Sequence, residues 1–266
     1  MKNISPFFVN CFCGPDESSG NPAAVYLDSV ANDEQKQNIA KKLNLPVTVF
    51  ITDSDSESPG IEYYYPNRKM SLCLHGTLAA AYVIFKKYAK KDSVFFTANR
   101  KRLNVKQNLD DYFSVEVFPD LFCQPSITSS LVSKFLNHDV EDLSNSLRLT
   151  VASVGSPKLL IAVPANILPK LKPNYSQIEQ WSRVNKINWL YVYSHHLIES
   201  HVFLARGFNP IGGHNEDAAT GVAAGALASA LKRSLIVEQG HALGKLCRIT
   251  VDYKSLGSIW VGGQVR

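Results

Sequence analysis

Two residues that could move protons, His75 and Asp217, each stand near the start of a stretch whose composition predicts a buried helix. His75 belongs to CLHGTLAAA (residues 73–81), and Asp217 to EDAATGVAAGAL (residues 216–227). The start of a helix presents N–H groups without partners and the positive end of the helix dipole, which suits an anion. The same dipole favours a neutral imidazole, which can donate or accept a proton. Two such helix starts facing one cleft would combine an acid/base pair with an anion cradle.

Each of these residues also has a purely structural interpretation. A histidine at this position could cap or pack the end of the helix, and acidic residues are favoured before first turns for capping alone. The pairing of His75 with Asp217 at two similar helix starts is what favours the catalytic interpretation.

Cys73 is a third candidate, because a helix start lowers the pKa of a thiol and could make it a nucleophile or a base. Racemases that use thiols need a second thiol on the other face of the substrate. The equivalent place in the second half of the chain holds Ala218, Ala219 and Thr220. Two-thiol racemisation is therefore disfavoured, and we expect Cys73 to be a small buried residue.

Composition bounds the class of protein. The 266 residues are 45% hydrophobic, enough for one large core or two ordinary ones. The net charge of +5 is spread along the chain, so nucleic acid is not an expected partner. Five cysteines without a CxxC pair argue against a disulfide framework or a zinc site and fit a reducing cytoplasm. No apolar run approaches the roughly 18 residues of a membrane span, so we expect neither membrane association nor a targeting signal.

Hydrophobic patterning predicts an α+β protein. In the first half we expect helices over 32–44 and 76–90 and strands over 6–13, 20–25, 47–51, 61–65, 93–97, 102–105 and 112–118. In the second half we expect helices over 126–136 and 176–184 and one that follows Glu216, with strands over 147–152, 158–163, 189–193, 201–205, 246–253 and 258–265.

The two halves of the sequence contain similar stretches. Aligning Gly76 with Gly221 matches two Ala-rich stretches that each predict a helix, which suggests two similar domains that each surround one helix. We expect a boundary near Pro119, giving domains 1–118 and 119–266. The last strand would complete the second sheet or return to the first.

Four motifs occur in the order and spacing of PhzF-like phenazine-biosynthesis proteins: GNPAAV (residues 20–25), CLHGTLAAA, ARGFNPIGG (residues 205–213) and EDAATGVAAGAL. The resemblance implies the diaminopimelate-epimerase fold, two similar domains with a curved sheet around a central helix, a cleft between them, and commonly a homodimer. It also implies a cofactor-independent isomerase. The best understood members move a proton on a dihydro-hydroxyanthranilic acid while the helix starts hold its carboxylate.

The same resemblance suggests roles for individual residues. His75 matches the histidine of the family motif CGHAT, and Asp217 matches the aspartate of EDPATG. Positions that would face the substrate are Asn21, Gly76, Thr77, Thr220, Gly221 and Val222.

One departure bears on catalysis. Members with isomerase chemistry carry an acid/base glutamate in a context like LSETTFV, whereas this chain reads LPVTVFI, with Val47 at the glutamate position. Loss of a general acid/base costs about 10²- to 10⁴-fold in rate. Leu74 also replaces the glycine of CGHAT, and Val222 replaces a serine that follows ATG. Two hypotheses follow: an isomerase of a small, open-chain or cyclic carboxylic acid, or a catalytically silent protein that binds such an acid.

Overall fold

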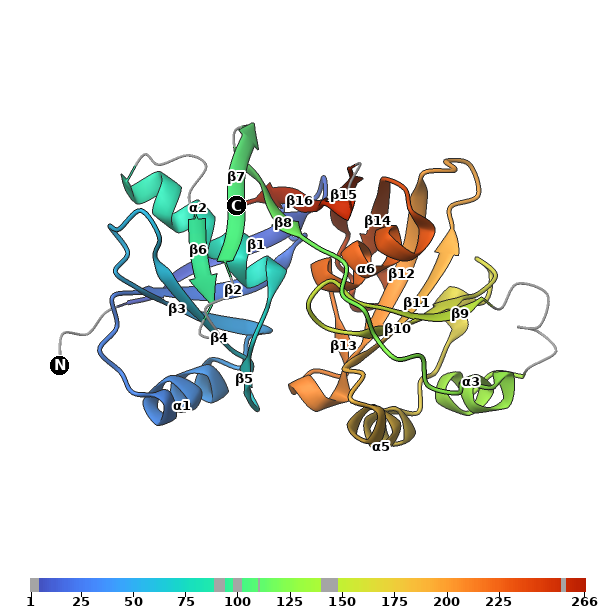
Figure 1. Ribbon diagram of the computed structural model, residues 1–266. Coiled ribbons are helices and arrows are strands. Elements are labelled where there is room, and N and C mark those ends of the chain that lie inside the picture. Colours follow the sequence, from blue (N-terminus) through green and yellow to red (C-terminus); the bar gives the residue numbers. More distant parts are fainter. Residues whose placement is uncertain (1–4, 89–93, 98–101, 110, 140–147, 255–256) are drawn as a thin grey trace.

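The computed structural model describes residues 5–88, 94–97, 102–109, 111–139, 148–254 and 257–266. It consists of two lobes side by side, joined by a segment that crosses from β8 towards α3 and β9 (Figure 1). Each lobe has one helix surrounded by strands, α2 in the first and α6 in the second. Among the described residues, no helix is long and apolar enough to cross a membrane.

The elements of the first lobe follow in chain order. They are β1 (Phe7–Cys13), β2 (Asn21–Leu27), α1 (Asp33–Leu43), β3 (Val47–Thr52), β4 (Gly60–Tyr64), β5 (Lys69–Met70), α2 (Leu74–Tyr88), β6 (Val94–Thr97), β7 (Arg102–Leu109) and β8 (Tyr112–Val117).

The second lobe repeats this series with added short helices. Its elements are α3 (Ser129–Leu136), β9 (Leu149–Ala152), β10 (Lys158–Ala162), η1 (Leu168–Lys170), α5 (Tyr175–Asn185), β11 (Trp189–His195), β12 (Val202–Phe208), η2 (Pro210–Gly212), β13 (Glu216–Asp217), α6 (Gly221–Leu231), β14 (Leu235–Gln239), η3 (His241–Leu243), β15 (Cys247–Tyr253) and β16 (Ile259–Val265).

The sheet pairing shows that the two lobes have one topology. In the first lobe β2 pairs in parallel with β3 across α1, and β4 with β6 across α2. In the second lobe β10 pairs in parallel with β11 across α5, and β12 with β14 across α6. A two-residue strand precedes each central helix, β5 beside β4 and β13 beside β12. Two similar α+β domains, expected from the Ala-rich echo, are therefore confirmed.

The last strand connects the lobes. β16 pairs antiparallel with β8 of the first lobe and β15 of the second, and its end also meets β1. It thus both completes the second sheet and returns to the first. The division between residues 118 and 119 stays a prediction.

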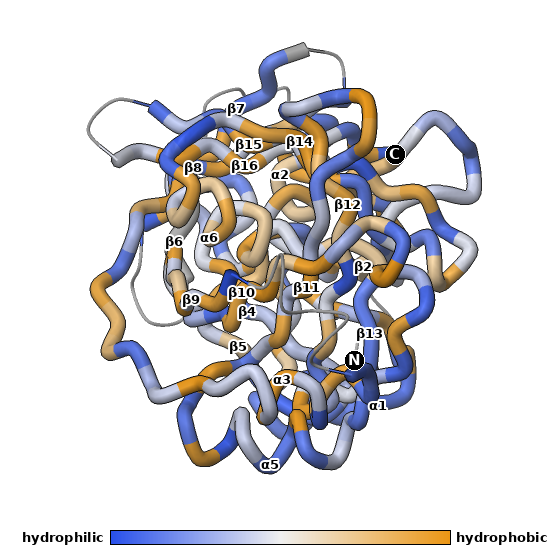
Figure 2. The backbone as a smooth tube through the Cα atoms, turned by 90° about the vertical axis from the view of Figure 1, so that its right-hand side faces the viewer, coloured by the Kyte–Doolittle hydropathy of each residue, from blue (hydrophilic) through white to orange (hydrophobic). Residues whose placement is uncertain are grey.

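The central helices are buried on nearly all sides because their small side chains allow strands to approach closely. Ala79, Ala80 and Ala81 of α2 have no exposed surface, and the same holds for Ala223 and Ala224 of α6. Figure 2 shows that most residues along both helices are apolar, whereas many residues of the outer loops are hydrophilic. Burial of this apolar surface is the main source of stability for each lobe.

Two expected helix starts need correction, and one longer strand was not expected. Helix α2 begins at Leu74 rather than Gly76, because the N–H of Thr77 already donates to the carbonyl of Cys73 at 2.9 Å, so His75 lies inside the first turn. Helix α6 begins only at Gly221, and Asp217 is in strand β13 before it. Strand β14 was not expected, because its short alternating run ends in polar Glu238 and Gln239. Lys90, Lys91 and Ser93 lie outside the described residues.

Candidate active site

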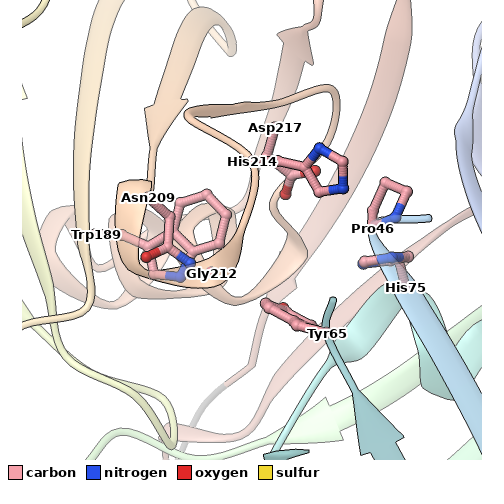
Figure 3. A pocket seen from close by; sticks show the side chains of 8 residues that line it. All are labelled: Pro46, Tyr65, His75, Trp189, Asn209, Gly212, His214 and Asp217. Carbon is pink, nitrogen blue, oxygen red and sulfur yellow. The ribbon is translucent and has the colours of Figure 1, made fainter. Parts of the chain in front are cut away.

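A pocket between the lobes collects polar and aromatic side chains from both (Figure 3). A second pocket shares part of its lining and adds Cys73, Lys158 and the start of α6. The cavity volumes are about 10 and 20 Å³, room for about one water molecule in each. Around the first pocket stand Pro46, Tyr65 and His75 of the first lobe and Trp189, Asn209 and Asp217 of the second.

The starts of α2 and α6 meet at these pockets. A Cβ atom placed on Gly221 would lie 3.2 Å from Cβ of Leu74 and 2.7 Å from Cζ of Phe12, so glycine permits this close approach. The first N–H groups of a helix have no intrahelical partner. Two sets of such groups therefore lie close to one small polar space, which an anion would satisfy.

His75 presents a free ring nitrogen to the pockets, both of which it lines. Its Nδ1 contacts Sγ of Cys73 at 3.3 Å, and its Nε2 is buried and has no hydrogen-bond partner among the described residues. Burial lowers the pKa of the ring to about 3, because a charged imidazolium would lose its hydration. The ring is therefore neutral at neutral pH, with Nε2 available to a ligand.

Asp217 faces the same pockets from the second lobe. Its Oδ1 accepts a hydrogen bond from Nδ2 of Asn21 at 2.6 Å, and its Oδ2 accepts one from Oγ1 of Thr220 at 2.9 Å. Burial raises the pKa of the carboxyl to about 6, although these two donors act in the opposite direction. Asp217 thus titrates close to neutrality, where a carboxyl group can both take and return a proton.

A further hydrogen-bond network holds Asp217 in place. Nε2 of Gln239 donates to the backbone carbonyl of Asp217 at 2.8 Å and to Oγ1 of Thr220 at 3.0 Å. The hydroxyl of Tyr191 donates to Oε1 of Gln239 at 3.0 Å. Because Asn21 belongs to β2, the carboxylate is fixed by both lobes.

Cys73 is a buried thiol, in agreement with the packing role favoured above. It is 2% exposed, and burial raises its pKa to about 12. The hydroxyl of Tyr65 donates to its sulfur at 3.6 Å. Thr220 immediately precedes α6 as Cys73 precedes α2, so the second half offers a hydroxyl where a racemase would need a thiol.

Val47 offers no proton carrier. Its side chain has no exposed surface and belongs to the core of the first lobe. Its Cγ1 would lie 3.3 Å from a Cβ placed on Gly76, so it packs against the first turn of α2. A titratable residue in its place would lie beside the helix start.

The structure brings most of the candidate residues together. Thr220, Gly221 and Val222 line the second pocket, and Asn21 bonds the Asp217 carboxylate. Gly76 and Thr77 are buried but are not among the residues that line either pocket. Oγ1 of Thr77 hydrogen-bonds the hydroxyl of Tyr63 at 2.5 Å. Substrate contact by all six residues, Asn21, Gly76, Thr77, Thr220, Gly221 and Val222, stays a prediction.

Several residues of the site were missed in the sequence. Tyr65, Trp189 and Asn209 line the first pocket, as does His214, whose Nε2 is buried without a partner. Asn209 lies in ARGFNPIGG and His214 three residues before Asp217, so proximity to known motifs was the available signal. Tyr65 and Trp189 follow or begin ordinary strands and carry no such signal.

Comparison with known proteins places this architecture in a family. A family model described as phenazine biosynthesis-like protein (PhzC-PhzF) matches residues 13–261. The chain belongs to this family. An uncharacterized isomerase of Clostridium acetobutylicum is 28% identical over 262 residues, covering 90% of this chain and 86% of the relative.

Solved structures agree on the fold. A PhzF-family protein of Bacillus anthracis has a TM-score of 0.84 at 23% identity, covering 100% of this chain and 97% of that one. A hydroxyproline epimerase of Agrobacterium vitis, solved with bound trans-4-hydroxy-L-proline, has a TM-score of 0.66 at 9% identity, covering 99% and 90%. The epimerase-like fold expected from the four motifs is therefore confirmed.

Proposed function

We propose that this member of the PhzC-PhzF family is a cofactor-independent isomerase that moves a proton between carbon atoms of a small carboxylic acid, open-chain or cyclic. The observation that carries the proposal is the meeting of two unlike groups in one pocket. Asp217, with a pKa of about 6, faces His75, which is neutral and has a free Nε2. Relatives named as isomerases support the same class of reaction.

In the proposed step the Asp217 carboxylate removes a proton from a carbon adjacent to, or conjugated with, the carboxylate of the substrate. The C–H electron pair delocalises towards that carboxylate while an O–H bond forms on Asp217. While it is on Asp217 the hydrogen exchanges with solvent; the O–H bond then breaks, and a proton from Asp217 forms a new C–H bond at another carbon. One proton leaves and one returns, so the reaction needs no oxidant or reductant.

His75 would stabilise the negative charge that develops in this step. Tyr65 donates to Sγ of Cys73, so the proton of the Cys73 thiol is free to point at Nδ1 of His75. Nδ1 then acts as an acceptor, and the neutral ring carries its own proton on Nε2. This tautomer directs an N–H donor into the pocket, where it is strongest against developing charge in a dry site.

The substrate carboxylate would lie at the starts of α2 and α6, near Gly221 and Val222. The pockets hold about one water each, so a substrate enters only when the surrounding side chains or the lobes move apart. The family resemblance further predicts a homodimer, and the cysteine content favours the cytoplasm. Analytical ultracentrifugation and cell fractionation would test these two predictions.

Val47 favours the second candidate function, a silent protein that binds small carboxylates without turnover. An apolar side chain buried in the core cannot replace the family glutamate as a proton carrier. The two functions differ in one observable, because only the isomerase incorporates solvent deuterium into carbon of a bound acid.

The test is hydrogen exchange in deuterium oxide, followed by proton NMR. The acids would include a dihydro-hydroxyanthranilic acid, as the family resemblance suggests, and trans-4-hydroxy-L-proline, as in the epimerase structure. We expect exchange at carbon with the native protein and a loss of about 10²-fold or more in His75→Gln and Asp217→Asn. His241→Gln and Asp252→Asn change the same residue types outside the pockets and should exchange normally. Unaltered exchange in both pocket variants would contradict the proposal.

A further inference from the structure

Lys158 is a buried lysine at the second pocket, and no carboxylate among the residues that the structure describes pairs with it. It is 1% exposed and lies at the start of β10, and it lines the pocket together with Asp217. Its amine donates to the carbonyl of Ser156 at 2.9 Å, to Oγ of Ser156 at 2.7 Å and to the carbonyl of Pro157 at 3.4 Å. All three acceptors are neutral, so none of the described hydrogen-bond partners of Lys158 balances the charge of its ammonium form.

Arg68 of the first lobe is not among the residues that line the two pockets, but hydrogen bonds through Asn188 and Ser156 connect it to Lys158. It lies in the turn between β4 and β5, and its Nη2 donates to Oδ1 of Asn188 at 3.3 Å. Nδ2 of Asn188 in turn donates to Oγ of Ser156 at 3.3 Å, the atom that Lys158 contacts. The Nε atom of Arg68 is buried without a partner, and no carboxylate in the described part of the chain pairs with this guanidinium.

Two other cations with little exposed surface each pair with a carboxylate. Lys36, 6% exposed, contacts Glu62, and Arg206 forms two hydrogen bonds with Glu216 at 2.8 and 2.7 Å. Charges removed from water are expensive unless a counter-charge accompanies them, and most folds pair them. Lys158 departs from that pattern at the pocket.

The pKa of Lys158 should respond to an anion bound beside it. Burial lowers this pKa well below the ordinary value, and the positive charge of Arg68 lowers it further. A negatively charged group beside Lys158 would oppose both effects and raise the pKa.

We propose that Lys158 and Arg68 form a second anion subsite, so that the substrate carries two anionic groups: one carboxylate at the helix starts and a second group, carboxylate or phosphate, at this cation pair. The pocket that Lys158 lines also contains Thr220 and Gly221, so one small molecule could reach both places. The inference rests on the proposed function only for the position of the first carboxylate.

Titration calorimetry with matched acids tests this subsite. Butyrate and valerate carry one carboxylate, glutarate and adipate add a second at the far end, and 4-phosphonobutyrate and 5-phosphonopentanoate add a phosphonate. We expect a doubly anionic acid to bind at least about tenfold more tightly than its matched monoacid, as for a hydrogen bond to a charged group. Preference for the diacid or for the phosphono acid distinguishes the two kinds of second group.

Variants of Lys158 and Arg68 test whether these two residues cause the tighter binding of doubly anionic acids. In Lys158→Met and Arg68→Gln the preference for the doubly anionic acid should fall by about tenfold, whereas the Kd of butyrate and valerate should stay constant. Arg248→Gln, which removes an arginine that pairs with Glu238 away from the pockets, should retain the preference. Circular dichroism confirms folding, and the Arg68 variant serves if Lys158→Met does not fold.

The outcomes separate this inference from the proposed function. If monoacids bind and no doubly anionic acid binds more tightly, the subsite is refuted while the helix-start site stands. If the variants weaken mono- and doubly anionic acids equally, the cations act on the fold rather than on a second group, and the subsite is again refuted. If the native protein binds none of the six acids, the carboxylate site of the proposed function fails as well.

Discussion

Replacing Asp217 by Asn should change how the free energy of unfolding depends on pH, because burial raises the pKa of the Asp217 carboxyl. The Asp217 carboxyl has a pKa of about 6 in the folded protein, against an ordinary value of 3.8. Because each pKa unit corresponds to about 1.4 kcal/mol, the ionised carboxylate destabilises the fold by about 3 kcal/mol. Well below pH 3.8 the group is protonated in both folded and unfolded states, and this cost is absent. It grows as the pH rises through the window from about 4 to 6.

The assay is urea unfolding of the native protein and the Asp217→Asn variant at pH 4 and at pH 7.5. We expect the variant to gain about 2.4 kcal/mol relative to the native protein between these two pH values, because the unfolded carboxyl is already partly ionised at pH 4. All other titratable groups are common to both proteins, so their contributions largely cancel in the difference. A difference between the two proteins that does not change with pH would refute the raised pKa and with it the role of Asp217 as a base near neutrality.

Three further predictions concern Arg206, Cys73 and Val47. Arg206→Met leaves Glu216 buried without its partner and should lower the free energy of unfolding by about 3–5 kcal/mol, much of which Glu216→Leu in the same chain should restore; equal stability of all three proteins in urea would contradict this. Iodoacetamide at pH 7.5 should label exposed Cys123 quickly and the buried Cys73 only after unfolding, as read by peptide mass spectrometry, and rapid native labelling of Cys73 would overturn its assignment as a buried thiol. Val47→Glu places a carboxyl beside the start of α2 and should raise the rate of deuterium exchange by about 10²-fold or more, whereas Val47→Gln should not. An unchanged rate in the glutamate variant would show that a carboxyl group at position 47 does not serve as the proton carrier.

Much of the fold could be predicted from local pattern. The Ala-rich runs after Cys73 and Thr220 predict buried helices, because only small side chains allow strands to surround a helix closely. The helix expected over 32–44 begins with a capping box, in which the side chains of Asn32 and Gln35 bond each other's backbone N–H groups. These signals lie in short stretches of sequence, so they can be recognised without knowledge of the tertiary structure.

The short strands could not be predicted in the same way. β5 and β13 have two residues each, and a strand of that length exists only because a neighbouring strand supplies its hydrogen bonds. β14 has five residues with polar Glu238 and Gln239 at its end. Gln239 is polar yet fully buried because it bonds Asp217 and Thr220, a reason that only the folded site reveals.

The candidate site was predictable in part. His75 and Asp217 were found because each precedes or begins a recognisable helix, whereas their pKa values depend on burial that the sequence does not specify. Lys158 and Arg68 are 90 positions apart in the sequence and belong to different lobes, so no spacing connects them. Their proximity arises only when the lobes pack together.

The central claim is that Asp217 of the second lobe and His75 of the first act on one bound acid. A crystal structure with the acid that exchanges fastest tests this claim most directly. We predict that the carboxylate of this acid lies at the starts of α2 and α6, with the exchanging carbon about 3–3.5 Å from a carboxylate oxygen of Asp217. Nε2 of His75 should donate a hydrogen bond to the acid in the same complex. An acid bound elsewhere, or one whose exchanging carbon faces neither Asp217 nor His75, would contradict the account.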